Sequence, residues 1–123
     1  MNDYLANLTD QALSNSYFRQ VLETGENMQV VIMSLLPGEE IGTEIHKENE
    51  QVLYCIGGKG EVIVNGTNHS FQKGDLILVR KGMQHNFINS SEEDMKIITI
   101  YSPPHHKNGI VHKTKADAEN EFN

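Results

Sequence analysis

The chain has one cysteine, no tryptophan and three prolines among its 123 residues. Cys55 has no second cysteine to pair with, so no internal disulfide can stabilise the fold, and its place in an apolar run predicts a small core residue. Basic residues are also in deficit, because ten lysines and arginines stand against seventeen aspartates and glutamates, a formal net charge of -7. Such a charge repels phosphate backbones and anionic lipids, so we expect neither nucleic acid nor a membrane surface as a partner.

Long hydrophobic segments are missing as well. The longest apolar run, residues 30–36, spans seven residues, whereas a membrane-spanning helix needs about 20. Residues 1–7 show neither the basic region nor the hydrophobic stretch of an export signal. We therefore expect a cytoplasmic protein, and 123 residues are enough for one domain with a single core.

Short β-favouring segments separated by turn residues follow one another every eight to twelve residues, without a long helical pattern. This spacing is typical of an all-β sandwich or a small barrel. The strongest local signal is Asn65-Gly66, which predicts a tight hairpin because both residues tolerate positive φ. The expected strands are residues 17–23, 28–36, 42–46, 51–56, 61–64, 67–71, 76–79, 85–88 and 95–101.

The chain divides into three expected parts. Residues 28–102 form the barrel, residues 1–27 pack on it as a short helix capped by Thr9 and a strand, and residues 103–123 form a polar C-terminal tail. The tail bears three histidines and a short helix capped by Thr114. We favour a mobile tail over one that folds across the barrel opening.

The expected strand at residues 28–36 is apolar on both faces. Such a strand is covered on both sides, by the core on one and by another element on the other. A second subunit would provide this cover, so we expect a homodimer.

Two stretches rich in glycine, histidine and carboxylates carry the candidate chemistry. Glu44 and His46 are two residues apart in an expected strand, so they project from the same face. A bend at residues 47–49 would let Glu50, at the head of the next strand, turn back beside them. His85 comes about forty residues later, and spacing alone does not place it near the others.

These stretches resemble the paired motifs of the cupin superfamily. The first family motif reads Gly, five residues, His, one, His, three or four, Glu, six, Gly; the second reads Gly, five, Pro, one, Gly, two, His, three, Asn. Every spacing agrees, while a glutamate replaces the first histidine and an arginine replaces the proline. The matching residues are Gly38, Glu44, His46, Glu50 and Gly57 in the first motif, and Gly74, Arg80, Gly82, His85 and Asn89 in the second.

The resemblance implies a single-domain jelly-roll β-barrel with one divalent metal ion inside. Carried over by position, the metal ligands are Glu44, His46, Glu50 and His85. Two imidazoles and two carboxylates suit Mn, Fe, Ni, Co or Zn, and four protein ligands leave room for water or substrate. Two close buried carboxylates repel unless a cation lies between them, so we favour an occupied site over one that has lost its metal.

The sequence shows no Ser-His-Asp order, phosphate-binding loop or CxxC motif, so any catalysis is expected to run through the metal. A loose likeness to mannose-6-phosphate isomerases implies a small polar ligand such as a sugar or sugar phosphate, with Glu50 moving a proton. Two alternatives stay open: a metal-dependent dioxygenase or decarboxylase of a small enol or carboxylate, and a non-catalytic module that binds a small molecule. Arg80 and Lys81 fit either an anion site or a solvated turn.

Overall fold

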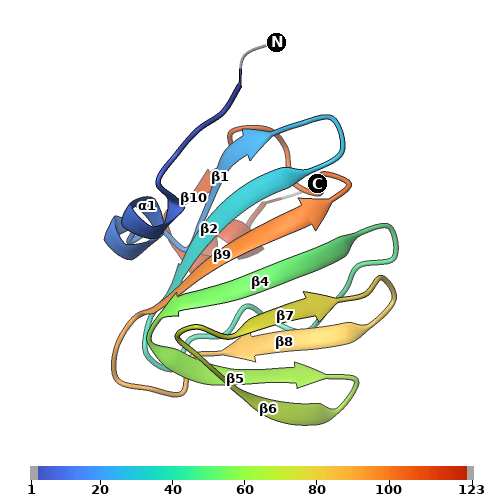
Figure 1. Cartoon of the computed structure of the whole chain (residues 1–123). Helices are drawn as coiled ribbons and strands as arrows, with labels where there is room; N and C mark the ends of the chain where they lie inside the picture. Colours follow the sequence, from blue (N-terminus) through green and yellow to red (C-terminus); the bar gives the residue numbers. More distant parts are fainter. Residues whose placement is uncertain (1–2, 122–123) are drawn as a thin grey trace.

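A computed structural model describes residues 3–121 as two β-sheets packed face to face, with a short helix near each end of the chain (Figure 1). The first two residues of the expected N-terminal segment and the last two of the expected tail lie outside the described residues. The helices are α1 (Leu8–Ser14) and α2 (Lys115–Glu119). The strands are β1 (Arg19–Thr24), β2 (Gln29–Leu35), β3 (Glu44–Ile45), β4 (Glu50–Gly57), β5 (Lys59–Val64), β6 (Thr67–Gln72), β7 (Leu76–Val79), β8 (Gln84–Ile88), β9 (Met95–Ser102) and β10 (Val111–His112).

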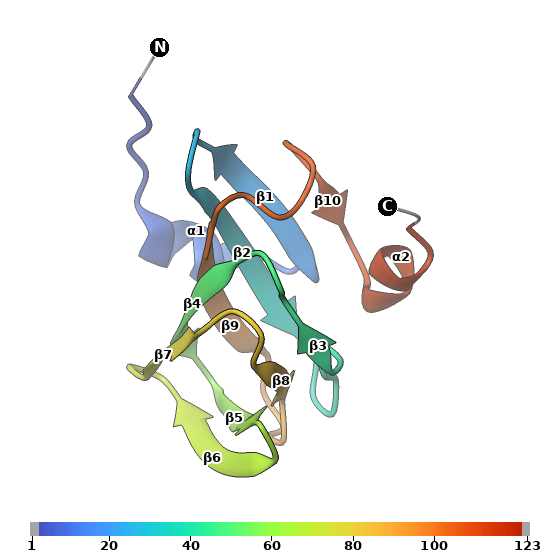
Figure 2. The same cartoon turned by 90° about the vertical axis from the view of Figure 1, so that its right-hand side faces the viewer.

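Strands that are distant in sequence are neighbours in both sheets. The larger sheet has the order β10-β1-β2-β9-β4-β7 and the smaller one β3-β8-β5-β6, and the strand pairs are antiparallel. Figure 2 shows β10 beside β1 at the edge of the larger sheet, with α2 beyond β10. The all-β jelly roll expected from the sequence is therefore confirmed. Neither helix in residues 3–121 has the length and apolar character needed to cross a bilayer.

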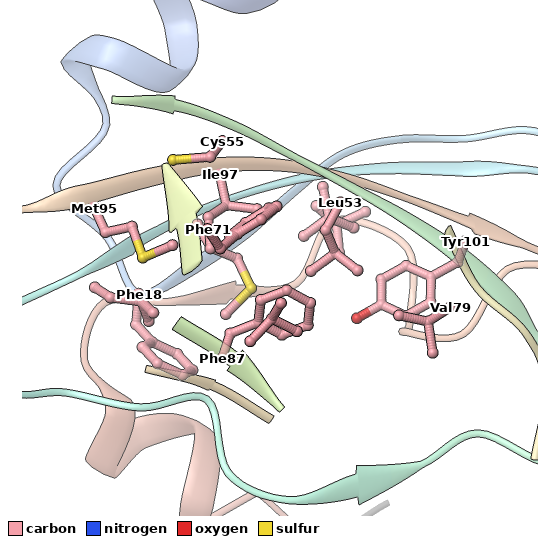
Figure 3. Close-up of a cluster of buried hydrophobic side chains, with 14 residues drawn as sticks. Phe18, Leu53, Cys55, Phe71, Val79, Phe87, Met95, Ile97 and Tyr101 are labelled. Carbon is pink, nitrogen blue, oxygen red and sulfur yellow. The ribbon is translucent and has the colours of Figure 1, made fainter. Parts of the chain in front are cut away.

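Alternate residues of each strand point into the space between the sheets, where they form the core. Figure 3 shows that Tyr101 and Val79 lie toward one end of this core and Met95 and Cys55 toward the other. Cys55 is fully buried, as expected. The buried members of the core are Phe18, Val21, Val31, Met33, Leu35, Leu53, Cys55, Val62, Phe71, Val79, Phe87, Met95, Ile97 and Tyr101.

Helix α1 covers part of the outer face of the larger sheet. Ala12 of this helix is fully buried against three isoleucines of β2, β4 and β9, namely Ile32, Ile56 and Ile98. The outer face of β2 is therefore covered by the chain's own helix, and the double-sided apolar pattern of this strand does not require a second subunit. Tyr54, Leu76 and Leu78 are exposed on β4 and β7, and the homodimer stays a prediction.

Local turn and cap signals agree with the structure at most positions. Asn65 and Gly66 have φ of 48° and 83° and join β5 to β6, as the hairpin signal predicted. Thr114 caps α2, as expected. The N-cap of α1 is Asn7 instead of Thr9, because the Asn7 side chain accepts a hydrogen bond from the backbone N–H at the helix start.

Gly60 on β5 occupies a position without room for a side chain. A Cβ there would lie 2.1 Å from the carbonyl oxygen of Ile88, whereas one at Gly25 would meet the Met28 carbonyl at an ordinary 3.5 Å. We expect Gly60→Ala to lower the free energy of unfolding by about 1–3 kcal/mol, the cost of overpacking. Gly25→Ala, the matched control, should stay within about 0.5 kcal/mol of the wild type. Urea denaturation measures both, and equal stability of the two variants would contradict the close approach.

Candidate metal centre

Glu44, His46 and His85 meet at one end of the barrel interior. Glu44 on β3 pairs in register with His85 on β8, and His46 follows two residues after Glu44. Both histidines are buried, and one potential ligand atom from each of the three residues lies within 4.8 Å of the others. Glu44 Oε1 is 3.8 Å from His46 Nε2. The structure thus brings together three of the four ligands predicted from the sequence.

Each histidine has a buried Nε2 without a hydrogen-bond partner. His85 Nδ1 lies 3.0 Å from the Met83 carbonyl oxygen and donates to it, which leaves Nε2 as the ring nitrogen available to the cluster. Burial, assisted by His105, His85 and Arg19, lowers the pKa of His46 to about 4. His46 is therefore neutral near pH 7, the state in which imidazole binds a metal.

Glu44 lies at the outer limit of the cluster, with 32% of its side chain exposed. Burial raises the pKa of its carboxyl group above the ordinary value of 4.5, and the neighbouring Arg19 and His85 offset part of this rise. A cation beside the carboxylate would favour the ionised form and reverse the effect of burial. The electrostatics of Glu44 thus suit a bound cation.

Glu50 does not join the cluster. Leu53 and Cys55 of the same strand are fully buried, so strand alternation sends Gln51 inward and Glu50 to the opposite face. Glu50 is exposed and pairs in register with Ser102, which is also exposed. The bend at residues 47–49 does not return Glu50 to the side of Glu44.

Gln51 takes the inward position on β4 and is only 3% exposed. Its Nε2 donates to Thr99 Oγ1 over 2.9 Å, while its Oε1 is buried without a hydrogen-bond partner. The amide oxygen can thus accept a partner inside the barrel, and this role of Gln51 was not predicted from the sequence. The family motif allows three or four residues between His and Glu, and a spacing of four after His46 leads to Gln51. The four-residue spacing was therefore the feature of the sequence that could have indicated Gln51.

The C-terminal tail folds over the same end of the barrel. Strand β10 pairs with β1, and Gln29 in the centre of the larger sheet anchors the segment that leads to it. Gln29 Oε1 accepts the backbone N–H groups of His105 at 3.1 Å and His106 at 2.9 Å, and Gln29 is fully buried. The expectation of a mobile tail is wrong here, because the barrel itself supplies the anchoring hydrogen bonds.

His105 reaches the candidate ligands from this tail. Its ring centre is 4.4 Å from that of His46, and it stacks on Tyr101 at 5.2 Å with 22° between the planes. His105 is nonetheless an exposed residue. His105 therefore stands at the opening between the cluster and the surrounding water.

A buried arginine also faces the barrel interior. Arg19 on β1 is 7% exposed and lies in register with the core residue Met33, on the interior face of the sheet. Its Nη1 is 3.4 Å from His112 Nδ1, and its Nε is buried without a partner. Arg19 was not among the residues predicted from the sequence, although its two-residue offset from Val21 in an expected strand indicated an inward direction.

Within residues 3–121, four buried side-chain atoms have no hydrogen-bond partner: Arg19 Nε, His46 Nε2, Gln51 Oε1 and His85 Nε2. Buried polar atoms are nearly always paired, so such a group calls for an explanation. Two imidazole nitrogens and an amide oxygen can all donate electron pairs to one cation, and the Glu44 carboxylate adds a negative charge. The donor set fits a divalent ion such as Mn, Fe, Co, Ni or Zn.

His106 should make the fold sensitive to acid. Burial, with the neighbouring charges of Arg19 and other histidines, lowers the pKa of His106 to about 3, against 6.5 for the free group. Between these values the unfolded chain binds a proton that the folded chain does not, so the free energy of unfolding falls as the pH drops below about 6.5. We expect His106→Gln to reduce this slope by at most about 1.4 kcal/mol per pH unit, the effect of one proton.

Urea denaturation of chelator-treated protein at a series of pH values measures this slope. His69→Gln is the matched control, because His69 is exposed on the β5–β6 hairpin and should leave the slope unchanged. Equal slopes for His106→Gln and the wild type would show that His106 is protonated alike in the folded and unfolded chains.

Comparison with known proteins places this geometry in a family. The cupin domain family matches residues 31–101, which include both motifs. Over 121 residues the chain is 39% identical to the uncharacterized protein YrkC of Bacillus subtilis strain 168, covering 94% of this chain and 65% of YrkC. The crystal structure of BH2720 from Bacillus halodurans aligns with a TM-score of 0.96 and 34% identity, covering 98% of this chain and 96% of that one.

A further relative is the H2HPP isomerase of Bacillus subtilis, which is 27% identical over 92 residues, or 74% of this chain and 39% of that protein. The chain thus spans less than two thirds of YrkC and well under half of the isomerase. The family match extends over more than half of the chain and contains the residues that form the cluster. The chain belongs to the cupin domain family.

Proposed function

We propose that this cupin binds one divalent metal ion through Glu44, His46, Gln51 and His85. The observation that supports this most directly is the convergence of buried, unpartnered imidazole nitrogens beside a carboxylate. Each of these nitrogens is costly to bury without a partner, and a cation would satisfy them together. A metal ion held there would serve as a Lewis acid that polarises a carbonyl oxygen.

We further propose that the reaction is the isomerisation of a small polar molecule such as a sugar or sugar phosphate. The relationship to an isomerase supports this class over the dioxygenase or decarboxylase alternative. The match covers only 39% of that relative, so it supports a class of reaction and not a particular substrate. A binding module without turnover is the remaining alternative.

His105 replaces Glu50 as the proposed proton-transfer residue. Glu50 faces away from the cluster, whereas the His105 ring contacts His46 and is open to solvent. Burial and the charge of Arg19 lower the pKa of His105, so the imidazole is neutral near pH 7 and able to accept a proton. Burial also raises the pKa of Tyr101 far above its usual range, which keeps that hydroxyl protonated as a hydrogen-bond donor.

Metal content of purified variants tests the proposed ligands. We expect about one metal ion per chain in the wild type, loss of the ion in Glu44→Ala and His85→Ala, and at least a tenfold weaker affinity in Gln51→Ala. Elemental analysis and titration with Mn²⁺ or Zn²⁺ give these values. Glu50→Ala is the matched control and should bind like the wild type. Loss of metal in Glu50→Ala with retention in Gln51→Ala would show that Glu50 and not Gln51 is the fourth ligand. A wild type that binds no metal would refute the proposed metal site.

Deuterium exchange tests the proposed chemistry. Sugars, sugar phosphates and 2-oxo acids are incubated with metal-loaded protein in D₂O, and NMR detects exchange at the carbon next to the carbonyl group. We expect exchange with Zn²⁺ and without oxygen, and a loss of about 100-fold or more in His105→Phe at unchanged metal content. His69→Phe serves as the surface control. Oxygen consumption that disappears with Zn²⁺ would indicate a dioxygenase, and saturable binding without exchange would indicate a binding module.

A further inference from the structure

The fourth unpartnered atom at the polar end of the barrel differs in kind from the other three. Arg19 Nε carries a hydrogen and can only donate, while His46 Nε2, His85 Nε2 and Gln51 Oε1 present lone pairs. A metal ion satisfies lone pairs and repels a guanidinium. The ion proposed above therefore leaves Arg19 without a partner.

Arg19 also lacks a counter-ion. Within residues 3–121, no carboxylate forms an ion pair with it, and its contacts are His112 Nδ1 at 3.4 Å and the Phe18 ring, 5.2 Å from the guanidinium carbon. His112 in turn contacts Glu121 through Nε2, so that carboxylate is already paired. A charge that is more than nine-tenths buried without an opposite charge is strongly disfavoured unless a ligand supplies one.

A purely structural role would use Arg19 to hold β10 against β1. The contact with His112 serves that purpose, yet it involves only one of the five N–H groups of a guanidinium. Arg19 projects from the interior face of β1 and is buried, and its charge influences the pKa of Glu44, His46, His105 and Tyr101, so the guanidinium and the cluster share the barrel interior. The unused donors are thus available to a ligand that enters the barrel interior.

We propose that Arg19 binds the carboxylate or phosphate group of a small anionic ligand whose neighbouring oxygen faces the Glu44, His46 and His85 cluster. A guanidinium matches either oxyanion with two parallel hydrogen bonds. The inference rests on the proposed function for the metal, and it narrows the ligand class from any small polar molecule to an anion. The exposed Arg80 and Lys81, considered from sequence, are not needed for this binding.

Calorimetric titration with glycolate, glycolamide and inorganic phosphate tests the proposal. Glycolate and glycolamide have nearly the same shape and share a hydroxyl group, but only glycolate is an anion. Each probe is titrated into Mn²⁺-loaded and into chelator-treated protein. The variants are Arg19→Met, Arg19→Lys and the matched control Arg80→Met, which removes the only other arginine in the chain.

We expect glycolate or phosphate to bind the wild type and Arg80→Met alike, and Arg19→Met roughly 10- to 100-fold more weakly, as for lost hydrogen bonds to a charged group. The affinity of Arg19→Lys should lie between those of the wild type and Arg19→Met, because lysine keeps the positive charge but lacks the planar guanidinium group. Tighter binding of glycolate would indicate that the natural ligand carries a carboxylate, and tighter binding of phosphate that it carries a phosphate group.

The proposal would be overturned if glycolamide bound as well as glycolate while phosphate did not bind. It would also be overturned if both Arg19 variants kept the wild-type affinity for the preferred anion, or if the wild type bound neither glycolate nor phosphate. Should Arg19→Met fail to fold, the glycolate–glycolamide pair on the wild type and Arg19→Lys still decide the matter. If the protein takes up no Mn²⁺, the proposed metal site fails while the chelator-treated titrations continue to test Arg19.

Discussion

The candidate site depends on the burial of polar side chains that strand alternation directs into an otherwise apolar barrel. Toward one end of the interior, aromatic and aliphatic side chains such as Phe71, Phe87 and Met95 pack against one another. At the other end, four polar atoms are withdrawn from water without partners in the described part of the chain. Each such atom costs roughly 1–3 kcal/mol, so the apolar half supplies the stability that allows the polar half to exist. Natural proteins tolerate such local conflict mainly where a ligand is bound.

Much of the fold followed from local chemistry in the sequence. The Asn65-Gly66 hairpin, the Thr114 cap and the recurrent short strands depend on residues close to one another, so the sequence contains their signals directly. The motif spacing likewise indicated Glu44, His46 and His85. The sequence placed Glu50 beside the cluster, whereas the structure directs Gln51 inward and Glu50 outward, because the two residues are adjacent and a shift of one residue in a strand exchanges the interior for the exterior. Only the register with the neighbouring strands decides between them.

The remaining parts of the site come from long-range contacts that periodicity does not encode. Arg19 is separated from Glu44 by a complete strand and two turns, and His105 follows the last strand of the predicted barrel. Gln29 links these parts, because it accepts two backbone N–H groups of the tail and donates to Thr24 Oγ1 and the His106 carbonyl. A glutamine in an apolar strand gave no indication of this role. The position of His105 in the tail thus depends on Gln29, the first residue of strand β2 in the larger sheet.

The pairing of β10 with β1 has a consequence for biosynthesis. During translation Arg19 emerges early, and its neighbour His112 emerges more than ninety residues later. Strand β10 pairs only with β1, at the edge of the larger sheet, so the rest of the jelly roll can assemble with this edge strand unpaired and the polar opening uncovered. A nascent chain would offer its carboxylate and imidazoles to ions in the cell before His105 closes over them. Assembly of the candidate ligands and the ordering of the last segment can therefore occur as separate events.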